Sequence, residues 1–198
     1  TVQLAPEWTA WVGLRHTRLN RHSVETDGDK DIRIEQTLNT PWAALGWAFA
    51  PKTRAYVSWG EGMETQAAPR RLKKSPVNAG QILPALKSRQ TEIGVKGQYA
   101  GDGVNAQWGA NVFEIRRPQA ETVGNRYQMD GDVRHRGIEG FWHGRMGAWA
   151  LGGSVMFIDA ERRGSQLAGI NGKSPVNVPE RAIKLSGVGN SNQRRARC

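Results

Sequence analysis

The sequence lacks any apolar run of the roughly 18 residues that a membrane-spanning helix needs, so transmembrane helices are excluded. Its single cysteine, Cys198, is the last residue, which rules out an intrachain disulfide and leaves no basis for cysteine-based metal or redox chemistry. No nucleophile motif, P-loop or dinucleotide fingerprint occurs, and the four histidines do not have metal-ligand spacing. These absences predict a protein that is not an enzyme and that holds no cofactor or metal.

An initiating methionine and a signal peptide are also missing, since the chain starts at Thr1 with neither. An exported protein needs such a signal. We therefore expect a mature chain or a fragment of a longer one.

Glycine and tryptophan are abundant, at 24 and 8 residues, and the mean hydropathy is −0.60. Strands of a membrane barrel carry one polar face, which lowers the mean hydropathy, and aromatic residues gather near their ends. The net charge of +10 also raises a nucleic-acid hypothesis. However, the basic residues are dispersed along the chain and cluster only at 70–74 and 194–197.

The stretch 87–116 predicts a long β-hairpin. Apolar and polar residues alternate from Thr91 to Tyr99, and after Gly101-Asp102 the apolar residues occupy even positions. A turn at Gly101-Asp102 brings every apolar side chain to one face. It pairs Tyr99 with Val104, Val95 with Trp108, and Thr91 with Val112. Each strand reaches the length of about 9–11 residues that a tilted strand needs to cross a bilayer.

In two further predicted hairpins, the apolar residues of both strands also fall on one face. The first has strands 42–50 and 53–60, joined at 51–53, and pairs Phe49 with Ala55 and Leu45 with Trp59. The second has strands 131–142 and 147–160, joined at 143–146. Single strands are predicted at 7–16 and 181–188, with a short extension at 32–34.

Short connections alternate with long ones along the predicted strands. The long ones cover 17–40, 61–86, 117–130 and 161–178. Tight turns at one end and long loops at the other are typical of outer-membrane barrels. The predicted fold is all-β: an antiparallel up-and-down meander of about eight strands from a transmembrane outer-membrane β-barrel.

The loop 61–86 carries the candidate ligand-binding cluster, which consists of Arg70, Arg71, Lys73 and Lys74. This cluster would attract an anionic ligand or lipopolysaccharide phosphates by long-range electrostatics. A solvated, charged loop is the simpler and favoured interpretation.

Other charged residues are interpreted as structural. Arg134 and Arg136 are expected to line the lumen or to pair with Glu139 or with carboxylates on neighbouring strands. Glu61 and Glu64 are expected to be solvated at the start of a loop.

Four short segments, taken in order, carry a family resemblance. They are YVSWGEG at 56–62, LKSRQTEIGVK at 86–96, RHRGIEG at 134–140 and NVPER at 177–181. Together they resemble the β-barrel of TonB-dependent ferric-siderophore receptors, over roughly residues 40 to 188.

The resemblance implies a receptor of the bacterial outer membrane that binds ferric siderophores outside and moves them inward. In that family the TonB energy-coupling protein acts through a plug domain inside a barrel of about 22 strands. The implied partners are a ferric siderophore, TonB (through the missing plug) and outer-membrane lipid, with no nucleic acid.

The chain departs from the family pattern in its plug, its strand number and its ending. We expect residues 1–189 to form a partial barrel and residues 190–198 to be a basic tail outside the family, so the fragment would not function alone. The alternatives are another outer-membrane barrel such as a porin, or a basic soluble β-protein that binds nucleic acid, whose affinity would depend on salt.

Overall fold

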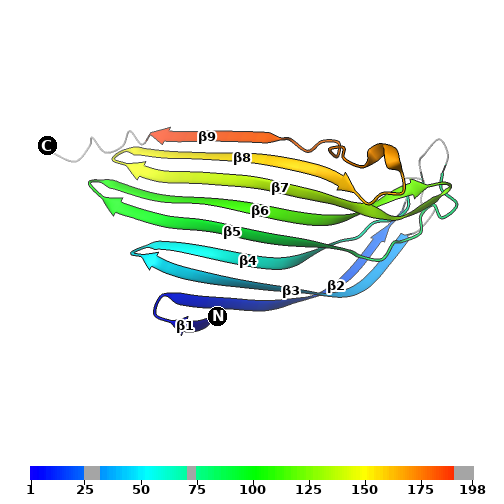
Figure 1. The fold of residues 1–198 in the computed structure, drawn as a ribbon, viewed down its shortest axis with the longest axis horizontal. Coiled ribbons are helices and arrows are strands. Elements are labelled where there is room, and N and C mark those ends of the chain that lie inside the picture. The colour runs from blue at the N-terminus through cyan, green and yellow to red at the C-terminus, as the bar shows by residue number, and fades with distance from the viewer. Residues whose placement is uncertain (25–31, 71–74, 190–198) are drawn as a thin grey trace.

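The computed structural model describes residues 1–24, 32–70 and 75–189 as one antiparallel sheet (Figure 1). Its nine strands follow one another in the order β1 to β9, each paired with its neighbour in sequence. The strands are β1 (Val2–Ala5), β2 (Trp8–Ser23), β3 (Ile32–Ala50), β4 (Thr53–Glu64), β5 (Leu86–Gly101), β6 (Val104–Val123), β7 (Arg126–Met146), β8 (Trp149–Arg163) and β9 (Arg181–Gly189). The predicted all-β meander is confirmed.

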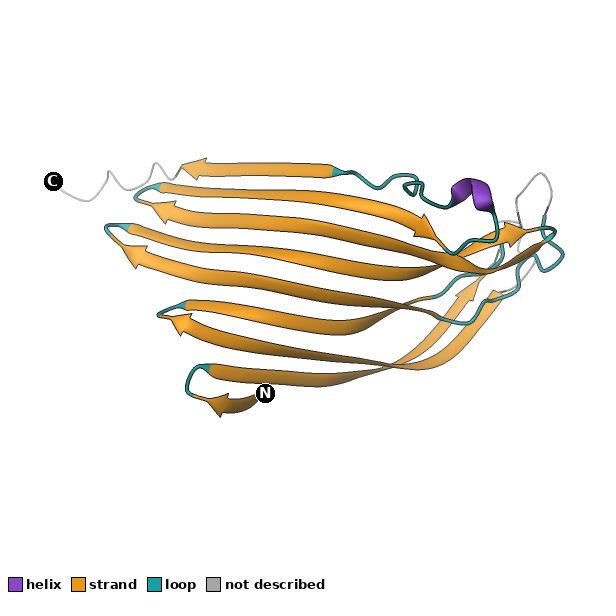
Figure 2. Cartoon of the chain, in the orientation of Figure 1, coloured by secondary structure: helices purple, strands orange, loops and turns teal. Residues whose placement is uncertain are grey.

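The fold differs from the prediction in strand number and in helix content. The described strands number nine rather than about eight because Val2–Ala5 adds a short strand at one edge. A single turn of 3-10 helix, η1 (Ala168–Ile170), lies between β8 and β9 and is the only helix in the described ranges (Figure 2). The predicted tail 190–198 lies outside the described residues.

The predicted tight turns lie together at one end of the sheet, and the long connections of the described residues lie at the other, where one two-residue turn also occurs. The turns 6–7, 51–52, 102–103 and 147–148 share one end, called here the turn end. The connections that begin at 24, 65, 124 and 164 share the other, called here the loop end (Figure 1).

The prediction of a long loop at 117–130 is wrong. Strands β6 and β7 continue through it and meet at a two-residue turn, Gly124-Asn125. Gly124 has a φ of +65°, which glycine adopts without strain. Likewise most of the predicted loop 17–40 is strand, and the extension at 32–34 is confirmed as the start of β3.

The register of the first hairpin is two residues away from the prediction. Gly101 pairs with Val104, so the turn is Asp102-Gly103, with φ values of +50° and +75°. Positive φ at both central residues defines a type I′ turn, for which Asp-Gly is a preferred pair. Because side chains alternate with a period of two, this shift leaves every side chain on the predicted face.

The other two hairpins also turn elsewhere than predicted. Trp47 pairs with Ala55, and a bulge precedes the turn at Pro51-Lys52, where Lys52 has a φ of +58°. In the third hairpin the strands continue to Met146 and Trp149 and turn at Gly147, whose φ is +57°. The predicted pairings and the connection 143–146 are therefore wrong, although the facing is right.

One face of the sheet is apolar and uncovered, and is called here the apolar face. A continuous row crosses five strands in register: Val57, Ile93, Val112, Ile138 and Phe157. All five are exposed although they are large and hydrophobic. Contiguous exposed apolar surface marks a membrane or protein contact.

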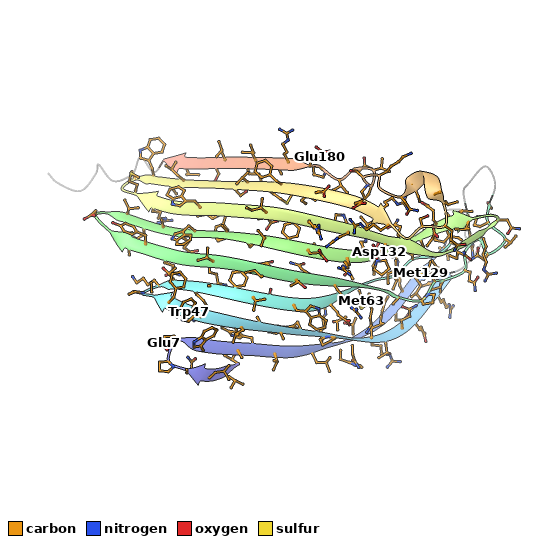
Figure 3. The ribbon with its side chains drawn as sticks, viewed as in Figure 1. Glu7, Trp47, Met63, Met129, Asp132 and Glu180 are labelled. Carbon is orange, nitrogen blue, oxygen red and sulfur yellow. The ribbon has the colours of Figure 1, made fainter. Side chains whose placement is uncertain are left out.

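Aromatic side chains border the apolar face at the turn end. Trp8 stacks on Trp47 with ring centroids 5.7 Å apart, and Phe49 lies 5.4 Å from Trp47 (Figure 3). Such a border is typical of the aromatic girdles of membrane barrels. Among the described residues, no helix is both long enough and apolar enough to cross a membrane.

Candidate ligand-facing surface

The opposite face of the sheet, called here the polar face, carries a cluster at its centre. Tyr56 donates a hydrogen bond from its hydroxyl to Glu92. Gly94 lies between Tyr56 and Asn111 in the register, and Asn111 pairs with Glu139 on β7. A Cβ at Gly94 would come within 2.8 Å of Asn111 Cβ, so glycine is what lets these side chains pack.

Two cations lie over aromatic rings on the same face. Lys96 Nζ is 5.2 Å from the centroid of Tyr56, and the guanidinium of Arg54 is 5.2 Å from that of Trp11. Both distances are within the range of a cation–π attraction. The polar face thus combines carboxylates, cations and a hydroxyl, which suits contact with water or a polar partner.

Loop 65–85 forms a small hairpin of its own at the loop end. Ala68 N donates to Gln81 O at 2.8 Å, and Leu83 N donates to Gln66 O at 2.9 Å. The loop packs against the polar face, because Gln36 Nε2 on β3 donates to Leu83 O at 3.3 Å. Leu86, the residue at which β5 begins, is only 1% exposed beneath it.

The tip of this loop binds the β6–β7 hairpin. Asn78 uses both ends of its amide: Nδ2 donates to Tyr127 O at 2.8 Å, and Oδ1 accepts from Tyr127 N at 2.9 Å. Val77 N donates to Asn125 O at 2.8 Å. The loop therefore spans the loop end from β4 to β7.

The base of the loop is held by an ion pair with bidentate geometry. Arg117 Nε and Nη2 donate to the Glu64 carboxylate at 2.7 and 2.6 Å. This hydrogen-bonded guanidinium lowers the pKa of Glu64. Tyr127 donates to Gln66 Oε1 at 3.2 Å, and burial raises the pKa of its phenol.

The predicted cluster is only partly within the described residues. Arg70 lies in the loop hairpin with its guanidinium against Gly80, where a Cβ would be 2.1 Å from Arg70 Nε. Arg71, Lys73 and Lys74 lie outside the described residues.

The structure contradicts one of the predictions for the other charged residues and confirms part of another. Glu61 was expected to be solvated, but its side chain is 9% exposed and pairs with Lys87 and Arg89. Arg134 and Arg136 pair with Glu114, a carboxylate on the neighbouring strand β6, which confirms one of the predicted alternatives. Both arginines occupy positions on the apolar face. They do not line the polar face.

Sequence reasoning did not single out Tyr56, Glu92 or the Asn78–Tyr127 contact. Tyr56 and Glu92 occupy polar positions in the alternating pattern of their strands. The face of the sheet on which they lie could therefore be inferred, but not that they bond to each other across β4 and β5. Among the residues that the structure describes, no three His, Cys, Asp or Glu side chains come together as a metal site would require.

The chain matches a family model described as TonB dependent receptor-like, beta-barrel, over residues 1–192. The comparison with curated proteins found no match.

Solved structures similar to the chain are receptors. BauA, the ferric preacinetobactin receptor of Acinetobacter baumannii, shares 27% identity with a TM-score of 0.66, over 91% of this chain and 27% of BauA. The siderophore receptor PiuA of the same organism gives 17% identity and a TM-score of 0.71, over 94% and 29%. FauA, the alcaligin outer-membrane receptor of Bordetella pertussis, gives 21% and 0.68, over 94% and 32%. The chain spans about a third or less of the length of each.

Proposed function

The chain belongs to the TonB-dependent receptor-like β-barrel family of the bacterial outer membrane, and from this premise we propose that it forms part of a receptor for ferric siderophores. The apolar face contacts lipid, and the polar face lines the interior of the barrel. The function is binding and transport, without catalysis. The match of the family model to residues 1–192 is the observation that carries the proposal.

We propose further that the chain acts only together with additional strands and a plug domain, in what is called here the full receptor. The strand order ends at β1 on one side and β9 on the other. Edge groups left without hydrogen bonds in hydrocarbon cost several kcal/mol each. Residues 1–189 therefore supply barrel wall. The boundary at 189 stays a prediction, because the family model matches as far as residue 192.

The ligand enters from the loop end. Loop 65–85 lies there across the polar face, and it carries Arg70 together with Arg71, Lys73 and Lys74. Their charge favours an anionic ferric complex approaching from outside. BauA, which binds ferric preacinetobactin, and the siderophore receptors PiuA and FauA support this class of ligand.

The test is uptake of radioactive iron by cells that lack their own siderophore receptors and express the full receptor. We expect uptake with at least one ferric siderophore from a panel of hydroxamates, catecholates and mixed ligands. Uptake should be lost when TonB is deleted. TonB-independent uptake, or equal entry of unrelated small solutes, would instead indicate a porin, the alternative that the family match does not favour.

The role of the basic cluster is tested separately, by changing all four cations to glutamine. We expect weaker binding of an anionic ferric siderophore, because four positive charges are lost from the entry side. The matched control changes Lys52 and Arg145, two exposed cations of the turn end. Equal loss in both variants would show that overall charge matters rather than the loop.

A further inference from the structure

Three arginines lie directly opposite one another on the apolar face. Arg89 on β5 pairs with Arg116 on β6, which pairs with Arg134 on β7. Adjacent strands are about 4.8 Å apart, so the backbone positions of the three arginines span about 10 Å. Like charges directly opposite each other destabilise a sheet unless something neutralises them.

The carboxylates nearby neutralise the row incompletely. Glu114 alone accepts hydrogen bonds from Arg116 Nε at 2.8 Å, Arg134 Nε at 2.8 Å and Arg136 Nε at 3.1 Å. Arg89 shares Glu61 with Lys87. Glu161 and Asp159 lie opposite Arg134 and Arg136 in the register, and Glu161 is itself paired with Arg163. Asp132 lies opposite Arg163 in the register. Counting all these groups gives six cations and five carboxylates.

Three of the guanidiniums remain available to another partner. The side chains of Arg89, Arg116 and Arg136 are 67%, 61% and 53% exposed, whereas Arg134 is 16% exposed and is held by two nitrogens against Glu114. Within the described ranges, each of the three exposed arginines uses only Nε in a hydrogen bond. The outer nitrogens of each fork are therefore free to bind phosphate, for which their geometry is suited.

The row lies at the border of the apolar face. The apolar row Ile93, Val112 and Ile138 is four residues away from Arg89, Arg116 and Arg134 along each strand, which is about 13 Å. Trp59 lies on the same face, two residues before Glu61 on β4, and Glu61 pairs with Arg89. A tryptophan beside outward cations is typical of the level of lipid headgroups.

We propose that Arg89, Arg116 and Arg136 bind the phosphate groups of an anionic lipid in the outer leaflet of the membrane. These three side chains lie on the face of the sheet opposite the one that loop 65–85 contacts, so a ligand inside the barrel does not reach them. The lipid supplies the negative charge that the sheet lacks, and its acyl chains lie along the apolar row below. Arg134 positions Glu114 and with it the two flanking guanidiniums.

The experiment measures lipid binding to the purified full receptor by native mass spectrometry. The probe is a lipopolysaccharide with a short core, offered intact or after enzymatic dephosphorylation. We expect the intact lipid to bind and the triple variant Arg89→Gln, Arg116→Gln, Arg136→Gln to bind it at least about tenfold more weakly, since each cation near an anionic surface contributes on the order of 1 kcal/mol. The dephosphorylated lipid should bind parent and variant alike.

Two controls keep the test independent of folding and of transport. The variant Lys52→Gln, Arg145→Gln removes exposed cations from the turn end and should bind the intact lipid as the parent does. The single variant Arg116→Lys keeps the charge and should retain most binding. TonB-dependent iron uptake is measured alongside, because its loss with lipid binding intact would fault the proposed function and not this site.

Equal binding of the intact lipid by parent and triple variant would overturn the proposal, and so would equal binding by the parent of intact and dephosphorylated lipid. Competition by inorganic phosphate at millimolar concentration that removes all bound lipid would also overturn it, since that result indicates a site for the free anion.

Discussion

Gly94 lies at a crowded position on the polar face. A Cβ there would approach Tyr56 Oη to 2.7 Å and Asn111 Cβ to 2.8 Å. At Gly140, on the apolar face, the nearest atom to a Cβ would be Val155 Cγ1 at 3.7 Å, an ordinary contact. At the residue scale, the same change therefore has different consequences at these two positions.

We expect Gly94→Ala to lower the free energy of unfolding by about 1–3 kcal/mol, because Asn111 cannot move its Cβ without moving β6. Gly140→Ala should be neutral or slightly stabilising. Urea unfolding of the full receptor in lipid vesicles, followed by tryptophan fluorescence, compares the two. Equal destabilisation by both would contradict the crowding described here.

Val95 and Lys96 test which face meets lipid. Val95 lies in register with Ala55 and Ala110 on the apolar face, whereas Lys96 lies over the ring of Tyr56 on the polar face. We expect Val95→Arg to cost about 2–4 kcal/mol near the bilayer midplane and Lys96→Ala to be mild. The measurement is equilibrium folding into vesicles; equal costs would refute the assignment of faces.

At the scale of elements, turn chemistry decides where each hairpin ends. Asp102 and Gly103 both adopt positive φ, whereas Gly101 is not among the residues with positive φ. The sequence offers Gly101-Asp102 and Asp102-Gly103 as overlapping turns, and only the second gives the observed pairing of Gly101 with Val104.

Gly103→Val should therefore lower the free energy of unfolding by about 1–2 kcal/mol, the cost of a side chain in the left-handed region. Gly101→Ala is the control, since its Cβ would meet only the far end of the flexible Tyr99 side chain, with Oη nearest at 3.2 Å. Chemical denaturation in vesicles reports both. A larger loss from Gly101→Ala than from Gly103→Val would favour the turn at Gly101-Asp102.

Loop 65–85 depends on few contacts for its position. Asn78→Ala removes both amide hydrogen bonds to Tyr127, so we expect faster hydrogen exchange at the loop and at the β6–β7 turn, with the membrane strands unchanged. Ser75→Ala removes only a contact within the loop, Ser75 Oγ to Arg70 O, and should change exchange little. Unchanged exchange in Asn78→Ala would show that the loop is held elsewhere.

At the scale of the whole molecule, the nine strands of the described residues make an open sheet with an exposed apolar face and two edge strands. When the chain is expressed alone, we expect no folded, heat-modifiable species in the outer membrane, because edges without partners are costly in hydrocarbon. The full receptor should show such a species on electrophoresis. A folded, membrane-inserted form of the isolated chain would contradict this.

Local pattern was sufficient for the fold class because alternation depends only on neighbours in the chain. Residues such as Val57, Ile93 and Val112 could be assigned to a common face before any pairing was known. The pairing itself, and the length of the strands at the loop end, could not be assigned. At 117–130 the turn-forming residues look like a loop, yet β6 and β7 continue because each supplies hydrogen bonds to the other.

The sequence alone determined an amphipathic meander and the end of the sheet where three of its tight turns lie, since side-chain parity and turn residues are local properties. Tertiary structure decided the registers, and with them which charged residues meet. The row Arg89, Arg116 and Arg134 comes from three strands, and its members are separated by up to 45 positions in the chain. No local pattern could bring them together, because their proximity follows from hydrogen bonds between strands rather than from the residues themselves.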